Sequence, residues 1–327
     1  MRLAFIGGFG HHYMRGALAS HPDWQIAVSG DGHDSDAAKN LSKGIQNSQW
    51  FDDPLTLLDE FKPDVVSIGA IYALNGTLAA LALERDIAVV SDKPIATSWP
   101  ALERLRELTG GTGRILLTEF PFRSHKEFRA ARWAVQSGQI GEVVLATAQK
   151  SYRFGASRPA WYRDRELYGG TLVWIASHAI DVIRFCSGVP YKRAIGTGGN
   201  VSRPDYASME DHVTALFELS NGGTAIVHAD YLRPQSAPTH GDDRLRIAGS
   251  QGVVEVRNGR CILISGSEGE RDITDSVQGR PVNEELLAAL NGESSEFYST
   301  QQSLEIAAIL LQARDATDER SWHSITP

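Results

Sequence analysis

One lysine, Lys93, stands where a parallel sheet would present it to a ligand. It follows Ile87–Val90, an apolar run rich in β-branched residues that predicts a short strand buried on both faces. Ligands bind beyond the carboxyl ends of such strands, and Pro94 disfavours a helical backbone at the lysine and keeps it extended. An extended backbone at this position can direct the lysine amine toward a bound molecule. The alternative is a solvated lysine at a strand end, because lysines are mostly exposed.

A second group of reactive side chains lies on a predicted apolar helix, Leu172–Ile183. His178 and Asp181 are three residues apart and Trp174 lies four before the histidine, so the three share one face of the helix. A histidine on an apolar helix can equally be a hydrogen-bonded core residue. The pattern His-x-x-Asp alone is too sparse for a metal site, and we expect no metal.

Composition narrows the class of protein. The 327 residues exceed the size at which one core keeps growing, so two domains are expected. A formal net charge of -8 argues against nucleic acid or an anionic membrane as a partner. Two cysteines, Cys186 and Cys261, cannot form a disulfide framework. No run reaches membrane-spanning length, and glycines interrupt the first apolar stretch before a signal-peptide core. We therefore expect a soluble, cytoplasmic protein.

The chain opens with a pattern typical of nucleotide binding. Leu3–Ile6 predicts a buried strand, His11–Ser20 predicts a helix, and a glycine-rich turn joins them: Gly7, Gly8, Phe9 and Gly10. Glycines let the backbone approach a pyrophosphate, and a helix N-terminus offers free N–H groups. The spacing is irregular, because Tyr13 occupies the third glycine position when counted from Gly8.

An acidic residue follows the second predicted strand, Gln25–Val28. Asp31 is our candidate for the ribose 2′-hydroxyl, which would favour NAD over NADP because a carboxylate repels a 2′-phosphate. Asp31-Gly32 is also a common turn pair. The two interpretations remain open, and NADP is not excluded.

Strands and helices continue to alternate, which predicts a doubly wound parallel sheet over the first third of the chain. Asp64–Gly69 is the next strand, and four residues at its carboxyl end are expected against the cofactor: Gly69, Ala70, Ile71 and Tyr72. The crossover rule places these residues, the glycine turn and Lys93 on one rim of the sheet.

The remainder of the chain predicts a second domain. An irregular stretch, Tyr152–Tyr168, is rich in arginine and aromatic residues, including Arg153, Trp161 and Tyr162. Such loops commonly carry binding function on a rigid scaffold, and the arginines favour an anionic substrate, because a guanidinium matches a carboxylate. From Asp211 onward the pattern is antiparallel, with a hairpin turning at Asn221–Gly223.

Taken together, these segments resemble the Gfo/Idh/MocA oxidoreductases, the family of glucose–fructose oxidoreductase and inositol dehydrogenase. The resemblance spans nearly the whole chain. It rests on five segments: Ile6–Gly10, Ser91–Ala96, Gly138–Val143, Gly169–Asp181 and Ile247–Gly252.

The resemblance implies an N-terminal Rossmann domain, residues 1–120, and a C-terminal α/β domain with a large open, mainly antiparallel sheet, residues 121–327. It implies NAD(P)-dependent hydride transfer on a sugar, cyclitol or sugar acid, in a homodimer or homotetramer. Lys93 would handle the proton with His178 as its catalytic partner. Asn75, Asp92 and Lys93 would join the cofactor site, and the substrate site would comprise Lys93, Arg153, Trp161, Tyr162, Trp174, His178 and Asp181.

The sequence departs from the family pattern at three places. Trp174 stands where many members have an aspartate, and Asn75 replaces a common histidine. The glycine turn is about one residue shorter than usual. Two other functions therefore stay open: glycoside hydrolysis assisted by tightly held NAD, and a cofactor-binding sensor without chemistry.

Overall fold

We describe a computed structural model of the chain over residues 1–33, 35–155, 158–266, 269–293 and 297–326. The chain forms two compact units. The first comprises residues 1–119, 166–169 and 281–307, and the second comprises residues 120–165, 170–280 and 308–327. Each unit is described by itself.

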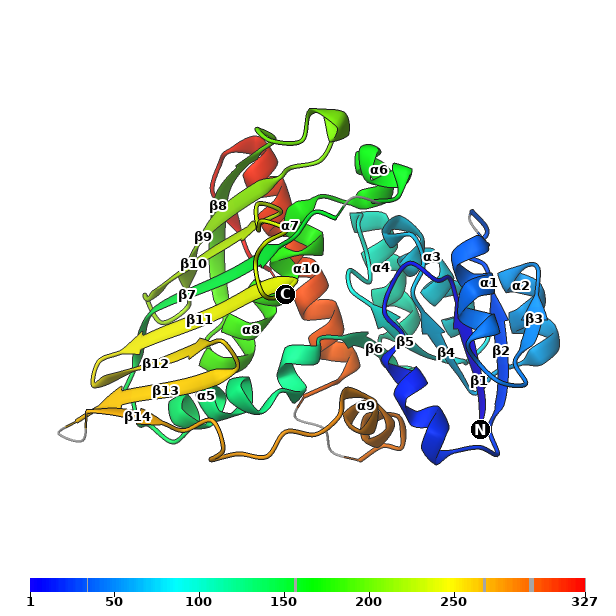
Figure 1. Ribbon diagram of the computed structural model, residues 1–327, viewed down its shortest axis with the longest axis horizontal. Helices are drawn as coiled ribbons and strands as arrows, with labels where there is room; N and C mark the ends of the chain where they lie inside the picture. The colour runs from blue at the N-terminus through cyan, green and yellow to red at the C-terminus, as the bar shows by residue number, and fades with distance from the viewer. Residues whose placement is uncertain (34, 156–157, 267–268, 294–296, 327) are drawn as a thin grey trace. The chain divides into compact units, whose positions relative to one another are not determined.

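The first unit is built on a six-stranded parallel sheet in the order β3-β2-β1-β4-β5-β6 (Figure 1). Its strands are β1 (Arg2–Ile6), β2 (Gln25–Ser29), β3 (Gln49–Phe51), β4 (Val65–Ile68), β5 (Ala88–Asp92) and β6 (Leu116–Glu119). Apolar residues fill the central strands, as expected for a sheet covered on both faces. This order confirms the predicted doubly wound fold and places the ends of β1, β4, β5 and β6 side by side.

Side-chain caps explain where two of the helices of this unit begin. The helices are α1 (Asp36–Lys43), α2 (Pro54–Thr56) with a π turn at Leu57–Phe61, α3 (Tyr72–Leu83), α4 (Trp99–Thr109) and α9 (Val282–Leu290). Asp53 caps α2 by accepting a hydrogen bond from the Thr56 N–H at 2.7 Å, and Ser98 caps α4.

The segment after the glycine turn differs from its prediction. A helix was expected over His11–Ser20, and the structure has a 3-10 helix over Tyr13–Ser20. The N–H groups of His11 and Tyr13 bond to carboxyl groups of other strands. These long-range bonds hold the first residues outside a helical geometry.

The second unit is built on a nine-stranded sheet in the order β14-β13-β12-β11-β7-β10-β9-β8-β15. The strands are β7 (Val143–Tyr152), β8 (Tyr191–Gly199), β9 (His212–Leu219), β10 (Thr224–Asp230), β11 (Gly241–Gly249), β12 (Gly252–Arg257), β13 (Arg260–Ser265), β14 (Glu270–Asp272) and β15 (His323–Ser324). Neighbours are antiparallel except for β7 and β10. The predicted mainly antiparallel sheet is confirmed.

Helices of the second unit pack against one face of this sheet (Figure 1). They are α5 (Lys126–Gln136), α7 (Thr171–Trp174) and α8 (Ala176–Ser187), with short 3-10 helices at Pro121–Ser124, Ala160–Arg163 and Pro204–Tyr206. The predicted single helix Leu172–Ile183 is interrupted at Ile175, and it ends at Gly188 with φ +69°, as glycine permits. The chain also contains α6 (Arg165–Tyr168) and α10 (Thr300–Glu319), and the division between the units falls within both.

Candidate active site

The glycine turn packs directly against the loop that follows β4. The Gly69 carbonyl accepts hydrogen bonds from the N–H groups of Phe9 and Gly10, both at 2.9 Å. Gly7 has φ +83°, and a Cβ atom there would lie 2.6 Å from the Ala70 Cα. A Cβ at Gly10 would lie 2.7 Å from a carboxylate oxygen of Asp92. A bare backbone at the end of β1 fits a dinucleotide, because only glycine lets main-chain N–H groups come this close to a phosphate.

Asp31, the predicted ribose ligand, is buried at the end of β2. One carboxylate oxygen accepts the Ile71 N–H at 3.0 Å and the other accepts the His33 N–H at 3.0 Å. Asp31 therefore ties the end of β2 to the start of α3, which the sequence did not indicate. Its role toward ribose stays a prediction.

Asn75 connects two of the predicted loops. Its side-chain oxygen accepts the Ala70 N–H at 3.2 Å, and its amide donates to the Pro94 carbonyl at 3.0 Å and the Asp92 carbonyl at 3.4 Å. The residue is fully buried. The asparagine therefore fixes the segment that carries Lys93 relative to the β4 loop.

Lys93 itself is 1% exposed at the end of β5. Its N–H donates to Asp92 at 2.9 Å, and the Lys93-Pro94 peptide bond is cis. Asp92 also accepts the His11 N–H at 2.9 Å, and its other contact with His11 is to Nδ1 at 3.3 Å. Burial opposes ionisation of Asp92, but the His11 hydrogen bonds and the electrostatic interactions with His11 and Lys93 bring the pKa of its carboxyl below the ordinary value.

His12, which the sequence did not single out, also anchors the glycine turn. Its Nδ1 lies 2.8 Å from the Ser67 hydroxyl and its Nε2 lies 3.1 Å from the Gly7 carbonyl oxygen. Burial lowers the pKa of His12 to about 4. The ring is therefore neutral near pH 7 and serves as a hydrogen-bonded brace between β1 and β4.

His178 lies in the second unit, on α8, and is 5% exposed. The Phe122 ring lies 5.1 Å from its imidazole, centroid to centroid, and the Phe120 ring lies 6.3 Å away edge-on. An aromatic enclosure of this kind fixes the orientation of the imidazole. Lys93 and His178 belong to different units, and their convergence on one substrate stays a prediction.

Asp181, one turn after His178, has a partner that sequence spacing could not reveal. The Nε atom of Arg123 lies 3.1 Å from both of its carboxylate oxygens, and a second nitrogen of Arg123 also contacts it. The side chains are 6% and 1% exposed, respectively. Asp181 was predicted to bind substrate, and the structure places it in a buried ion pair with Arg123.

The aromatic segment before α7 is folded around an arginine. Arg158 donates to the Tyr162 hydroxyl at 3.1 Å and to the Phe154 carbonyl at 2.6 Å. Trp161 packs against Tyr162 with ring centroids 4.3 Å apart, and Trp174 is 5% exposed on α7. The predicted substrate-site residues Trp161, Tyr162 and Trp174 are therefore all largely buried.

Basic side chains gather near the ends of β7 and β11. Lys150 pairs with Asp243 at 2.6 Å and lies 4.3 Å from the centre of the Phe122 ring. Burial lowers the pKa of Lys150 although Asp243 opposes this. Burial and the positive charges of Arg158, Arg153 and Lys150 lower the pKa of His240. We call Lys150, Arg153, Arg158 and His240 the basic cluster.

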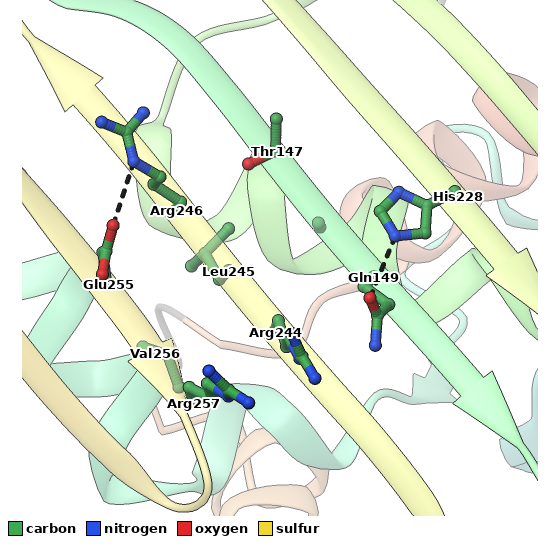
Figure 2. Close-up of a pocket in the computed structure, with 10 residues that line it drawn as sticks. Thr147, Gln149, His228, Arg244, Leu245, Arg246, Glu255, Val256 and Arg257 are labelled. Carbon is green, nitrogen blue, oxygen red and sulfur yellow. Dashed lines mark hydrogen bonds and ion pairs between the residues drawn. The ribbon is translucent and has the colours of Figure 1, made fainter. Parts of the chain in front are cut away.

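A pocket lies on the face of the nine-stranded sheet, where it is lined by β7, β10, β11 and β12. Figure 2 shows its side chains, with Arg246 paired to Glu255 and His228 bonded to Gln149. Its volume is about 310 Å³, and Arg244 and Arg257 stand side by side at its edge (Figure 2). This pocket lies on the sheet itself, and none of the predicted site residues lines it.

Two further observations concern the described residues as a whole. Among them, no group of three or more histidine, cysteine, aspartate or glutamate side chains is placed to hold a metal ion. No helix in the described ranges is long and apolar enough to span a bilayer.

Comparison with known families matches both parts of the chain. Residues 1–120 match the family described as "Oxidoreductase family, NAD-binding Rossmann fold", and residues 128–255 match the "GFO/IDH/MocA C-terminal domain". The chain belongs to the GFO/IDH/MocA oxidoreductases. The predicted family and its NAD-binding domain are confirmed.

Three relatives illustrate the breadth of the GFO/IDH/MocA family. D-glucoside 3-dehydrogenase of Escherichia coli is 28% identical over 218 residues, which cover 61% of this chain and 62% of that protein. The alignment thus spans less than two thirds of that curated relative. A Thermotoga maritima protein provisionally named as an oxidoreductase has a solved structure with a TM-score of 0.93 and 31% identity, covering 99% of this chain and 100% of that one. Levoglucosan dehydrogenase in complex with NADH and L-sorbose has a TM-score of 0.83 at 16% identity, covers 100% of this chain and 99% of that one, and supports the fold alone.

Proposed function

We propose that this protein is an NAD-dependent oxidoreductase that transfers hydride between nicotinamide and a secondary alcohol or carbonyl of a sugar-like substrate. The observation that carries the proposal is the placement of Lys93. It is a buried lysine at the carboxyl end of β5, and the adjacent Asp92 contacts the residue after the glycine turn of an NAD-binding domain. The named relatives that act on sugars and cyclitols support the reaction class.

In this proposal Lys93 holds the substrate hydroxyl and exchanges its proton, and His178 is the second group on that hydroxyl. Bound NAD would supply the hydride acceptor. The glycine turn and Ile71 would hold the dinucleotide, and Asp31 would favour NAD over NADP. Asp92 and Asn75 orient Lys93 through its main chain, because the Asp92 carboxylate accepts the Lys93 N–H and the Asn75 amide donates to the carbonyls of Asp92 and Pro94 on either side of it.

We further propose that the substrate carries an anionic group. The basic cluster supports this, because it places the side chains of Lys150, Arg153 and Arg158 near His240, where burial and their charges lower the pKa of His240 although Asp243 opposes them. Arg158 is engaged by Tyr162 and Phe154, whereas the Nε atom of Arg153 is buried without a hydrogen-bond partner among the described residues. Arg153 is therefore the arginine best suited to receive a carboxylate.

We also propose that copies of the chain associate through the open face of the nine-stranded sheet, as the family resemblance implies. This face presents paired charges such as Arg246 and Glu255. Analytical ultracentrifugation of the wild type and of Arg246→Glu tests this: a wild type that sediments as a monomer at micromolar concentration would contradict it.

The decisive experiment is hydride transfer measured at the absorbance of reduced nicotinamide. NAD and NADP are each tried with matched pairs of neutral sugars and the corresponding sugar acids. With the best substrate, Lys93→Met should slow single-turnover hydride transfer by at least about 100-fold with cofactor still bound. Lys62→Met, an exposed lysine of the same unit, is the control. Unchanged chemistry in Lys93→Met would remove the lysine from the mechanism.

The proposed preference for an anionic substrate is tested with a separate pair of variants. Arg153→Gln should raise KM for the sugar acid and leave the KM of its neutral counterpart nearly unchanged, whereas Arg163→Gln, at an exposed position of the same segment, should affect neither. Tightly held cofactor with no net turnover on any alcohol would instead favour redox-assisted glycoside hydrolysis.

A further inference from the structure

Three consecutive residues after the glycine turn are each bonded to a different strand of the first unit. His11 donates its N–H to Asp92 of β5 at 2.9 Å, and the His12 ring lies 2.8 Å from the Ser67 hydroxyl of β4. Tyr13 donates its N–H to Glu119 of β6 at 3.0 Å. The last polar side chains of three strands thus determine the path of the segment His11–Tyr13.

Glu119 is the unexplained member of this set. It is fully buried, and its second oxygen has no hydrogen-bond partner in the described structure. A buried oxygen without a partner is costly. Neither the glycine-turn motif nor the resemblance assigns it a role.

Glu119 and Asp92 are neighbours across the sheet, because β5 and β6 pair in parallel with Asp92 opposite Glu119. We call the two residues the acid pair. Two adjacent buried carboxyl groups cannot both be ionised at low cost. Asp92 receives the N–H groups of Lys93 and His11 and contacts the His11 ring, whereas among the described residues Glu119 receives the Tyr13 N–H alone. The negative charge of the acid pair therefore resides on Asp92.

The electrostatic surroundings agree with this assignment. Burial and the charge of Asp92 raise the pKa of Glu119 well above the ordinary value, although the Tyr13 N–H opposes the shift. The groups that face the acid pair are the Tyr13 side chain, His11, His12 and Lys93, and the buried His12 ring is neutral near pH 7. Burial and both carboxyl groups also raise the pKa of the Tyr13 hydroxyl, so that side chain stays neutral.

We propose that Glu119 is a positioning residue that holds the segment His11–Tyr13 in the conformation that binds the dinucleotide, and that it does so as a neutral carboxylic acid. The proposal rests on the proposed function, because it assumes that this domain binds NAD. With Glu119 neutral, the acid pair carries one negative charge at the edge of the sheet where an anionic dinucleotide binds. Ionisation of Glu119 at alkaline pH would add a second charge and repel it.

The test compares NADH binding to the full-length protein across pH, followed by nicotinamide fluorescence. Wild-type affinity should fall by about tenfold as Glu119 ionises, the effect of one added charge at about 10 Å in a medium of effective dielectric constant about 20. Glu119→Gln keeps the acceptor for Tyr13 without the titrating proton, so it should bind NADH within about threefold of wild type near pH 7 and lack the alkaline decline. Glu119→Leu loses the acceptor and should bind about tenfold more weakly at every pH.

Glu60→Gln, an exposed glutamate of the same unit, is the control and should follow the wild-type profile. Equal alkaline declines in wild type and Glu119→Gln would overturn the proposal while leaving NAD binding intact. Infrared spectra of the protein without cofactor provide an independent measurement. The carbonyl band of a neutral carboxylic acid should be present near pH 7 and lost in Glu119→Gln.

Absence of NADH binding at any pH would contradict the proposed function, and the infrared band would then decide the charge state of Glu119. Absence of that band in the wild type would overturn the neutral-acid assignment whether or not NADH binds.

Discussion

The buried ion pair of Arg123 and Asp181 allows a quantitative test of what holds α8 in place. Arg123 and Asp181 are 6% and 1% exposed, and the Arg123 Nε atom lies 3.1 Å from both carboxylate oxygens. Removing one partner leaves the other buried without its counter-charge, which costs about 3 to 5 kcal/mol of unfolding free energy. We therefore expect a loss of that size for Arg123→Met and for Asp181→Leu.

The double variant should recover most of this loss. Arg123 lies over the Phe120 and Phe185 rings, at 5.3 and 6.0 Å from their centres, so a methionine there meets apolar partners. Replacing both charges by apolar groups of similar size is often nearly neutral. We expect a net loss below about 2 kcal/mol and hence a coupling free energy of at least about 4 kcal/mol.

Urea unfolding of the four proteins, followed by tryptophan fluorescence and circular dichroism, measures this cycle. Two probes are needed because a chain of two units can unfold in two steps. Additive losses in the double variant would refute the ion-pair argument. Measuring KM for the substrate in the same variants tests the separate prediction that Asp181 binds substrate. If Asp181 contacts the substrate directly, KM should stay raised in the double variant even though the double variant regains stability.

Two further predictions concern the first unit. Because burial lowers the pKa of His12 from 6.5 to about 4, the folded state binds fewer protons than the unfolded state between these values. The contribution of His12 to the free energy of unfolding should be complete above pH 6.5 and should fall by up to roughly 3 kcal/mol as the pH drops toward 4. The difference in unfolding free energy between wild type and His12→Gln should therefore shrink over that range. Asn75→Ala should cost about 2 to 4 kcal/mol in urea unfolding, because it opens a cavity and leaves the buried Ala70 N–H without its acceptor. A loss below about 1 kcal/mol would show that water replaces the amide.

Short-range signals predicted most of the elements but not their ends. The apolar runs of β1, β4 and β5 and the Asp53 cap are readable because a strand or a cap depends on a few neighbouring residues. The start of the helix after the glycine turn was wrong. Its first N–H groups bond to Asp92 and Glu119, which are 81 and 106 residues away in the chain.

The candidate active site likewise contains residues that the sequence revealed and residues that only the structure revealed. Lys93 and the glycine turn stand out because their positions follow directly from a strand and its end. Glu119 and Arg123 carry no comparable signal, since a glutamate at a strand end and an arginine in a loop are ordinary residues. Their importance comes from their partners, Tyr13 and Asp181.

The amino-acid sequence alone determined the family, the buried strands β1, β2, β4 and β5 of the first unit, and the residue types available for chemistry, whereas α1 and β3 were not predicted from it. It could do so because glycine turns, proline and apolar periodicity act over a few residues. Tertiary structure alone decided that Asp31 binds the Ile71 N–H, that Asp181 is paired, and that two carboxyl groups share one sheet edge. The physical reason is the strand order β1-β4-β5-β6, which brings together side chains that are distant in the chain.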